Sequence, residues 1–267
     1  MRPSLLAGLI SYGSLVFMRP SAGLFYETDN TYNNSGTLTA YDSISWYRAT
    51  RAASSISIVV SNMHCAAGNS ADSYGPSTLM YTVGVEVNGV MTQATCSGAS
   101  TATIATGSIG YATFDAVGLN IGPADYVAIK LRITAPNGTD VITVPRHTTS
   151  NNNDANTLFY TKDAFSPNQA SDKSLVASTN SFWTTTASGG FQHRPFAVLS
   201  AAASAGPSVV VIGDSIGSPK TGYVQRLLNT YDIPSINLAK SGEKQQDWPA
   251  NAIGRATFIY GKTAIVE

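Results

Sequence analysis

The sequence predicts a jelly-roll-like β-sandwich over residues 24–200, followed by the start of an α/β domain over residues 208–267. Three observations carry this prediction. Residues 24–200 contain short runs of alternating apolar and polar residues separated by turn residues, a pattern typical of antiparallel sandwiches. Residues 201–207 are small and uncharged, as in a linker. After residue 207 the pattern changes to a continuous β-branched strand followed by helical spacing.

Within the sandwich, the clearest predicted element is a hairpin over residues 81–96. Two alternating arms flank Asn88–Gly89, the dipeptide that tight hairpin turns favour. Residues 125–145 repeat the pattern, with alternate apolar residues on one face. Residues 146–190 are polar and rich in turn residues, so long loops are expected there. Further strands are expected over residues 55–63 and 194–201.

Within the α/β part, the sequence predicts a strand, a helix and two more strands. Residues 208–213, Ser-Val-Val-Val-Ile-Gly, contain a continuous β-branched run, as in a parallel strand buried on both faces. Residues 221–231 show helical spacing, residues 233–239 form a second short strand, and residues 263–267 begin a third. A parallel sheet of barely three strands is small for a stable domain, so we expect this domain to be incomplete in the chain.

Composition narrows the class of protein. Lys plus Arg and Asp plus Glu both number 16, and only 12% of residues are charged, so neither a nucleic acid nor an anionic membrane is an expected partner. Residues 1–23 combine Arg2, an interrupted apolar run and small residues, which favours a signal or leader segment and not a transmembrane helix. The sequence thus favours a secreted or cell-surface protein over a cytoplasmic one.

The two cysteines, Cys65 and Cys96, either form one disulfide or remain two free thiols.

Ser215 is the strongest candidate for chemistry. It follows Gly213 and Asp214 directly after the first buried strand, at the sheet edge where ligands bind in α/β domains. The amides at the start of the following helix would face an anion formed there. Ser215 therefore fits an acyl-transfer nucleophile, and it equally fits a helix N-cap.

Additional residues favour the first interpretation. Gly213-Asp214-Ser215-Ile216 resembles the first sequence block of the SGNH (GDSL) hydrolase family, and residues 236–248 resemble its second block. The resemblance covers about residues 208–267 and implies a three-layer, flavodoxin-like domain that hydrolyses esters through an acyl-enzyme. It implies that Ser215 is the nucleophile, that the amides of Ser215 and Gly242 form the oxyanion hole, and that Asp214 is structural. No cofactor or metal is implied.

The later blocks of the family do not follow. Neither Gly-x-Asn-Asp nor Asp-x-x-His occurs after Ser215, so the triad Asp and His are not present in this chain. The three histidines, His64, His147 and His193, all precede the serine, and each is expected to be a loop or surface residue; His193 is the nearest to the linker. A serine without a base is a poor nucleophile, so we expect the chain to be truncated and inactive by itself.

Two alternatives remain open. Gly213-x-Ser215-x-Gly217 also matches the nucleophile elbow of α/β-hydrolases, which normally lies deeper in its domain. The protein could instead be a non-catalytic carbohydrate-binding, surface or phage structural protein with a vestigial hydrolase segment. For the enzyme, the expected partner is a carboxylic ester such as an acylated carbohydrate. Aromatic residues that could stack on sugars, although core positions are favoured for most, are Trp46, Tyr47, Tyr74, Phe159, Tyr160, Phe182 and Trp183.

Overall fold

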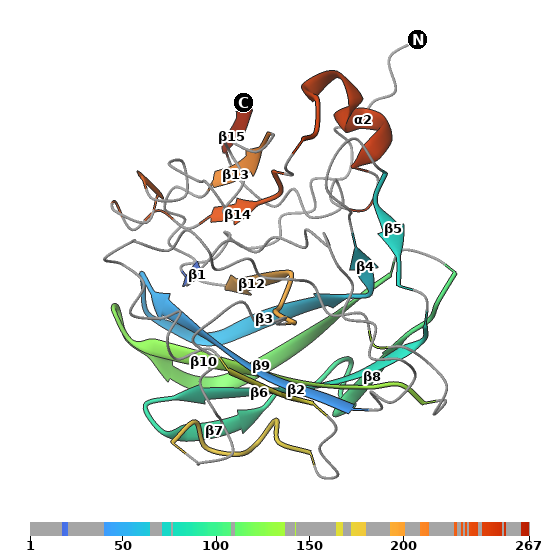
Figure 1. The fold of residues 1–267 in the computed structure, drawn as a ribbon. Helices are drawn as coiled ribbons and strands as arrows, with labels where there is room; N and C mark the ends of the chain where they lie inside the picture. The colour runs from blue at the N-terminus through green and yellow to red at the C-terminus, as the bar shows by residue number, and fades with distance from the viewer. Residues whose placement is uncertain are drawn as a thin grey trace.

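A computed structural model shows a chain dominated by antiparallel β-sheets, with little helix among the described residues (Figure 1). The structure describes residues 18–20, 40–64, 71–75, 77–107, 110–136, 142, 164–167, 172–179, 193–200, 209–213, 227–228, 231, 233, 235–239, 242–252, 254 and 263–266.

The larger sheet has seven strands, all paired antiparallel, with the order β1-β2-β10-β6-β7. Strand β11 pairs with β2, and β8 pairs with β6. The strands are β1 (Met18–Pro20), β2 (Ala40–Ala49), β6 (Leu79–Val87), β7 (Val90–Gln93), β8 (Thr101–Ile104), β10 (Tyr126–Thr134) and β11 (Ala164–Pro167). Strand β1 falls within the segment predicted to be a leader.

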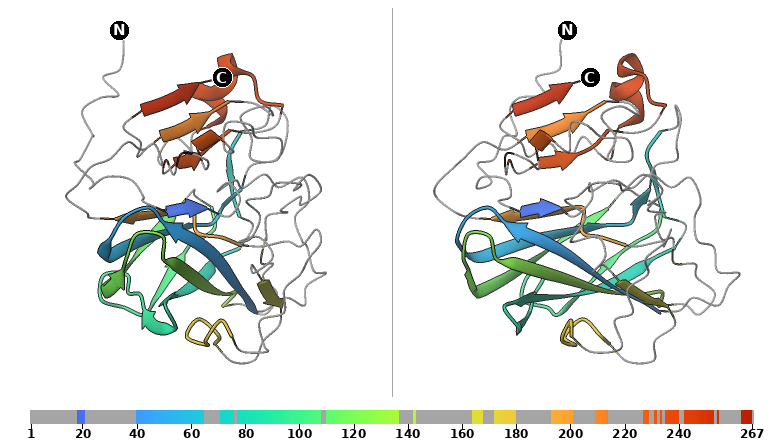
Figure 2. Two further views of the ribbon diagram at one scale, coloured as in Figure 1. Left: turned by 90° about the vertical axis from the view of Figure 1, so that its left-hand side faces the viewer. Right: turned by 60° about the vertical axis from the view of Figure 1, so that its left-hand side comes forward.

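The smaller sheet has three antiparallel strands in the order β12-β3-β9, and together the two sheets form a β-sandwich (Figure 2). Its strands are β3 (Ala53–Ser61), β9 (Tyr111–Ile121) and β12 (Ala197–Ser200). A short two-stranded ribbon, β4 (Met63–His64) with β5 (Ser73–Tyr74), continues from β3. The coarse prediction of a sandwich is therefore confirmed.

Alternation of side chains explains the core of the sandwich. On β10, the odd-numbered residues from Val127 to Ile133 are buried and belong to the main hydrophobic cluster. On β3, Ile56, Ile58 and Val60 contribute to the same cluster. Because successive side chains of a strand point to opposite faces, these apolar residues fix which face of each sheet turns inward.

The hairpin predicted over residues 81–96 is confirmed. Strands β6 and β7 pair directly across Asn88 and Gly89, whose φ angles are 50° and 82°. Two successive left-handed residues are the geometry of the tight turn that Asn-Gly favours. The side-chain amide of Asn88 also donates a hydrogen bond to Asp125 Oδ2 at 3.1 Å.

The prediction of loops throughout residues 146–190 is wrong in part. Residues 164–167 form β11, which pairs with β2 from Tyr41 to Ile44. Residues 172–179 have no strand or helix but pack on the outer face of the larger sheet, where a Cβ on Gly84 would lie 1.9 Å from the carbonyl oxygen of Ser174. The turn-rich composition indicated irregular backbone but not these contacts with distant strands.

After the sandwich, three short strands form a parallel sheet. Strand β13 (Val209–Ile212) pairs in parallel with β14 (Ser235–Asn237) on one side and with β15 (Thr263–Val266) on the other. All three strands lie where the sequence predicts them. Between β13 and β14, Leu227 and Leu228 are helical, and Leu228 is buried.

The parallel sheet shares a hydrophobic core with the sandwich. Val210, Ile236 and Leu238, which lie on one face of the sheet, belong to the same buried cluster as the sandwich core. Residues on the other face form a separate cluster of Val209, Val211, Leu228 and Ala239. Both views in Figure 2 place the parallel sheet over the side of the sandwich that carries β12. The sandwich therefore covers one face of the parallel sheet.

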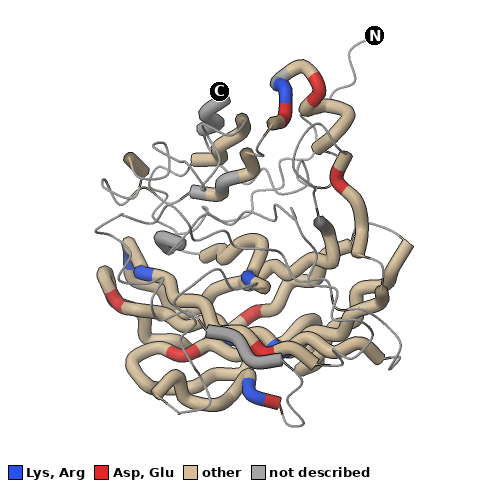
Figure 3. The backbone as a smooth tube through the Cα atoms, in the orientation of Figure 1, with Lys and Arg blue, Asp and Glu red and all other residues tan. Residues whose placement is uncertain are grey.

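Charged residues of both signs are interspersed along the described chain (Figure 3). Besides the helical residues Leu227 and Leu228, the structure describes two short helical segments, a 3₁₀ turn, η2 (Gln245–Asp247), and α2 (Trp248–Asn251). Among the described residues, none of the helices has the length and apolar character required to cross a membrane.

Candidate functional site

The candidate site lies at the carboxyl edge of the parallel sheet. Strand β13 ends at Ile212, and the next residue, Gly213, is buried. The predicted nucleophile Ser215 and its neighbour Asp214 lie outside the described residues. Because β13, β14 and β15 are parallel, the residues that follow each of them leave the sheet at the same edge.

Gly242 leaves this edge from the neighbouring strand. The amide of Leu238 donates to the carbonyl of Val211 at 2.8 Å, which extends the pairing one residue beyond β14. Gly242 then adopts a φ of 78° and is exposed to solvent. A left-handed backbone at this position explains the glycine, since residues with a Cβ rarely adopt it. The chain thereby turns toward the buried residue Glu243.

The segment after Gly242 docks on the sandwich. Trp248, the first residue of α2, packs against the shared hydrophobic core. The amide of Asp72, just before β5, donates to the carbonyl of Asn251 at 2.7 Å. In Figure 1, β5 accordingly rises beside α2. The sandwich and the segment that follows Gly242 are thus in direct contact.

His193, the histidine nearest to the linker, does not lie at this edge. His193 is buried in the sandwich, where its ring lies edge-on to Tyr81 with centroids 5.7 Å apart. Burial lowers the pKa of His193 to about 3, although a hydrogen bond with the backbone of Arg194 opposes the shift. The ring is therefore neutral at physiological pH, as in a core histidine. His64 lies in β4, and His147 is outside the described residues.

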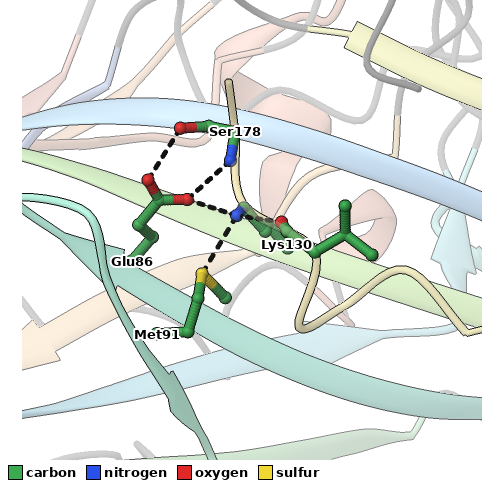
Figure 4. A network of polar contacts seen from close by, with 5 residues as sticks. Glu86, Met91, Lys130 and Ser178 are labelled. Atoms are coloured by element: carbon green, nitrogen blue, oxygen red, sulfur yellow. Dashed lines mark hydrogen bonds and ion pairs between the residues drawn. The ribbon is translucent and has the colours of Figure 1, made fainter. Parts of the chain in front are cut away.

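A buried polar network on the sandwich was missed by the sequence analysis (Figure 4). Lys130, on β10, is fully buried and forms a salt bridge with Glu86 on β6. Its ammonium group also donates to the carbonyl of Val176 and approaches Met91 Sδ at 3.1 Å. Ser178 donates to both carboxylate oxygens of Glu86, through its amide and its hydroxyl, each at 2.8 Å.

The electrostatics of this network are those of a closed structural pair. Burial alone would raise the pKa of Glu86, but the hydrogen bonds from Lys130 and Ser178 outweigh it and hold the pKa below its ordinary value. Burial lowers the pKa of Lys130, and the hydrogen bond and charge of Glu86 oppose this shift. Each hydrogen atom of the ammonium group has a nearby acceptor. Such an arrangement holds β6, β10 and residues 172–179 together.

A second buried ion pair lies on the same face of the larger sheet. Arg132 donates to Asp42 Oδ2 at 2.9 Å, and the amide of Lys173 lies 3.4 Å from Oδ1. Burial raises the pKa of Asp42 to about 6, against the opposing charge of Arg132. Alternation would place these polar residues in solvent, but residues 172–179 pack on this face and contact Asp42 through the amide of Lys173.

Among the aromatic candidates for sugar stacking, three fall in the described chain. Tyr47 is a core residue, and Trp46 is half-buried beside Ile44 and Ala128. Tyr74 is exposed, at 45%. The other four lie outside the described residues. The preference for core positions therefore holds for Tyr47 but not for Tyr74.

Cys96 is a free cysteine in the turn between β7 and β8, where it exchanges backbone hydrogen bonds with Ala99. Cys65 lies outside the described residues. In the part of the chain that the structure describes, no three His, Cys, Asp or Glu residues are grouped so that they could hold a metal ion.

In comparisons with known proteins, the chain matches no family model and no curated protein sequence.

Proposed function

We propose that this chain carries the nucleophile segment of a serine ester hydrolase of the SGNH type. Ser215 is the nucleophile, the amides of Ser215 and Gly242 bind the oxyanion, and Asp214 shapes the turn. The observation that supports the proposal is the strand order β14-β13-β15. In sheets of this order, ligands bind at the carboxyl edge beside the first strand, and both Gly213 and Gly242 follow strands that end there.

In the proposed reaction, Ser215 Oγ attacks the ester carbonyl and loses its proton to a base. The backbone amides stabilise the negative charge that develops on the carbonyl oxygen, the alcohol leaves, and water hydrolyses the acyl-enzyme. The sequence from residue 216 to residue 267 contains no Asp-x-x-His. The reaction therefore requires an acid and a base from outside these residues, and we expect residues 1–267 alone not to turn over.

The substrate class that we propose is an acylated carbohydrate, with the protein secreted or at the cell surface. The exposed Tyr74 in β5 supports this choice, because an aromatic ring at the surface can stack on a sugar ring. The choice of carbohydrate rests on this residue and on the sandwich beside the sheet, whereas the ester chemistry rests on Ser215.

The test begins with the coding sequence beyond codon 267. If it encodes Gly-x-Asn-Asp and later Asp-x-x-His, the complete product should react with a fluorophosphonate probe and hydrolyse p-nitrophenyl acetate. Ser215→Ala should abolish both signals, whereas Ser218→Ala, three residues away, should retain them. Gly242→Ala keeps the amide but strains the left-handed backbone at φ 78°, so it should displace this donor and lower kcat by up to roughly 100-fold. Probe labelling that survives Ser215→Ala would overturn the assignment.

A further inference from the structure

Residues 172–179, which we call the strap, lie across the outer face of the larger sheet. Ser174, Val176 and Ser178 are buried or half-buried, whereas the alternating residues Leu175, Ala177 and Thr179 are exposed. One side of the strap therefore faces the sheet and the other is largely exposed, although Leu175 Cδ2 also reaches toward Gly84. The residues of the strap form neither a strand nor a helix.

Hydrogen bonds and one close contact hold the strap in place. Ser178 donates twice to Glu86, and the carbonyl of Val176 accepts from Lys130. Gly84 leaves the space for the strap backbone, since a Cβ there would lie 1.9 Å from the carbonyl oxygen of Ser174. Among the described residues of the strap, Val176 packs on the small apolar cluster of this face, and Leu175 Cδ2 approaches Gly84.

Closing the strap takes two ions away from water. Lys130 is fully buried and Glu86 nearly so, and the removal of such ions from solvent opposes much of the attraction between them. When the strap opens, water can replace its hydrogen bonds and hydrate both ions. Opening the main core offers no such compensation, since that core is apolar.

From this contrast we propose that the strap is a latch, which opens locally while the sandwich stays folded and thereby exposes the Glu86–Lys130 pair. Opening also uncovers the apolar surface of Ile44, Trp46 and Ala128 on the same face. The device is independent of the proposed hydrolase chemistry, because none of its residues belongs to the parallel sheet.

Hydrogen exchange measured by mass spectrometry tests the latch. In the closed state the amides of Lys173 and Ser178 donate to Asp42 and Glu86 on the sheet, so their exchange reports opening. In the wild-type chain, exchange of this peptide should be nearly insensitive to low urea, whereas that of β10 should accelerate with urea. Exchange of the strap only together with β10 would contradict local opening.

Two variants test what holds the latch closed. Ser178→Ala removes a hydrogen bond to a carboxylate and should speed strap exchange by about tenfold or more, with β10 unchanged. Thr179→Ala, which removes an exposed hydroxyl one residue away, is the matched control and should have no effect. Gly84→Ala should also open the strap, because the added methyl group on β6 would clash with the carbonyl oxygen of Ser174. Equal exchange in the serine and threonine variants would overturn the proposed role of Ser178.

Discussion

The carboxyl group of Asp42 should make the stability of the sandwich depend on pH. Its pKa in the folded chain is about 6, above the value near 4 of an exposed Asp. The folded state therefore binds more protons between about pH 4 and pH 6, so the free energy of unfolding falls as the pH rises through this range. The stabilisation is complete below the unfolded pKa and lost above the folded one.

Asp42→Asn cannot titrate, so it should remove this pH dependence, which amounts to roughly 3 kcal/mol across the range. Urea denaturation at several pH values between 4 and 7 would measure it. Asp115→Asn, at an exposed carboxylate on β9, is the control and should retain the wild-type slope. An unchanged slope in Asp42→Asn would mean that Asp42 is not the titrating group.

Lys130 should be far more sensitive to substitution than a surface lysine. Lys130→Met leaves Glu86 buried without its counter-ion, a change that typically costs about 3–5 kcal/mol. Adding Glu86→Gln removes the unpaired charge while retaining an acceptor for Ser178, so the double variant should recover part of the loss. Chemical denaturation of the wild-type chain, Lys130→Met and the double variant measures this. Lys244→Met, at an exposed position, should change stability little. A double variant no more stable than Lys130→Met would contradict the ion pair.

At the scale of elements, the strands could be predicted well because their signals are local. The Asn88–Gly89 turn and the apolar alternation of β10 correctly gave strand positions and inward faces. Strand β11 and the strap could not be predicted in this way, because their positions depend on contacts with β2 and β6 and not on their own composition. The same alternation predicts that Lys130 faces solvent. This prediction is wrong, because the strap, a distant segment of the chain, packs against Lys130.

The candidate site was predictable to a similar degree. The apolar run before Gly213 predicts a buried strand, and the structure has β13 there, with parallel neighbours on both sides. The spacing to Gly242 placed a glycine after β14, where the backbone is left-handed. The roles of Ser215 and Gly242 in catalysis stay predictions, because they follow from a resemblance to a family and not from local physics.

At the scale of the whole molecule, the shared core should make the sandwich and the parallel sheet unfold together. The sequence indicates a linker at residues 201–207, and linkers suggest independent modules. However, Val210 of the parallel sheet belongs to the same buried cluster as the sandwich core. Val59 and Ala197, on the face of the smaller sheet opposite to Ile58, are also fully buried. Separation of the two parts would expose apolar surface on both, so unfolding of one destabilises the other.

Differential scanning calorimetry should therefore show one transition for the chain. Val210→Ala on the parallel sheet and Val59→Ala on the sandwich each remove two buried methyl groups, at a cost of about 2 kcal/mol. Both should lower the same Tm, by roughly 4–8 °C for a chain of this size. Val90→Ala, at a position 67% exposed on β7, should leave it unchanged. Two transitions, one moved only by Val210→Ala and the other only by Val59→Ala, would show that the shared core does not couple the two parts.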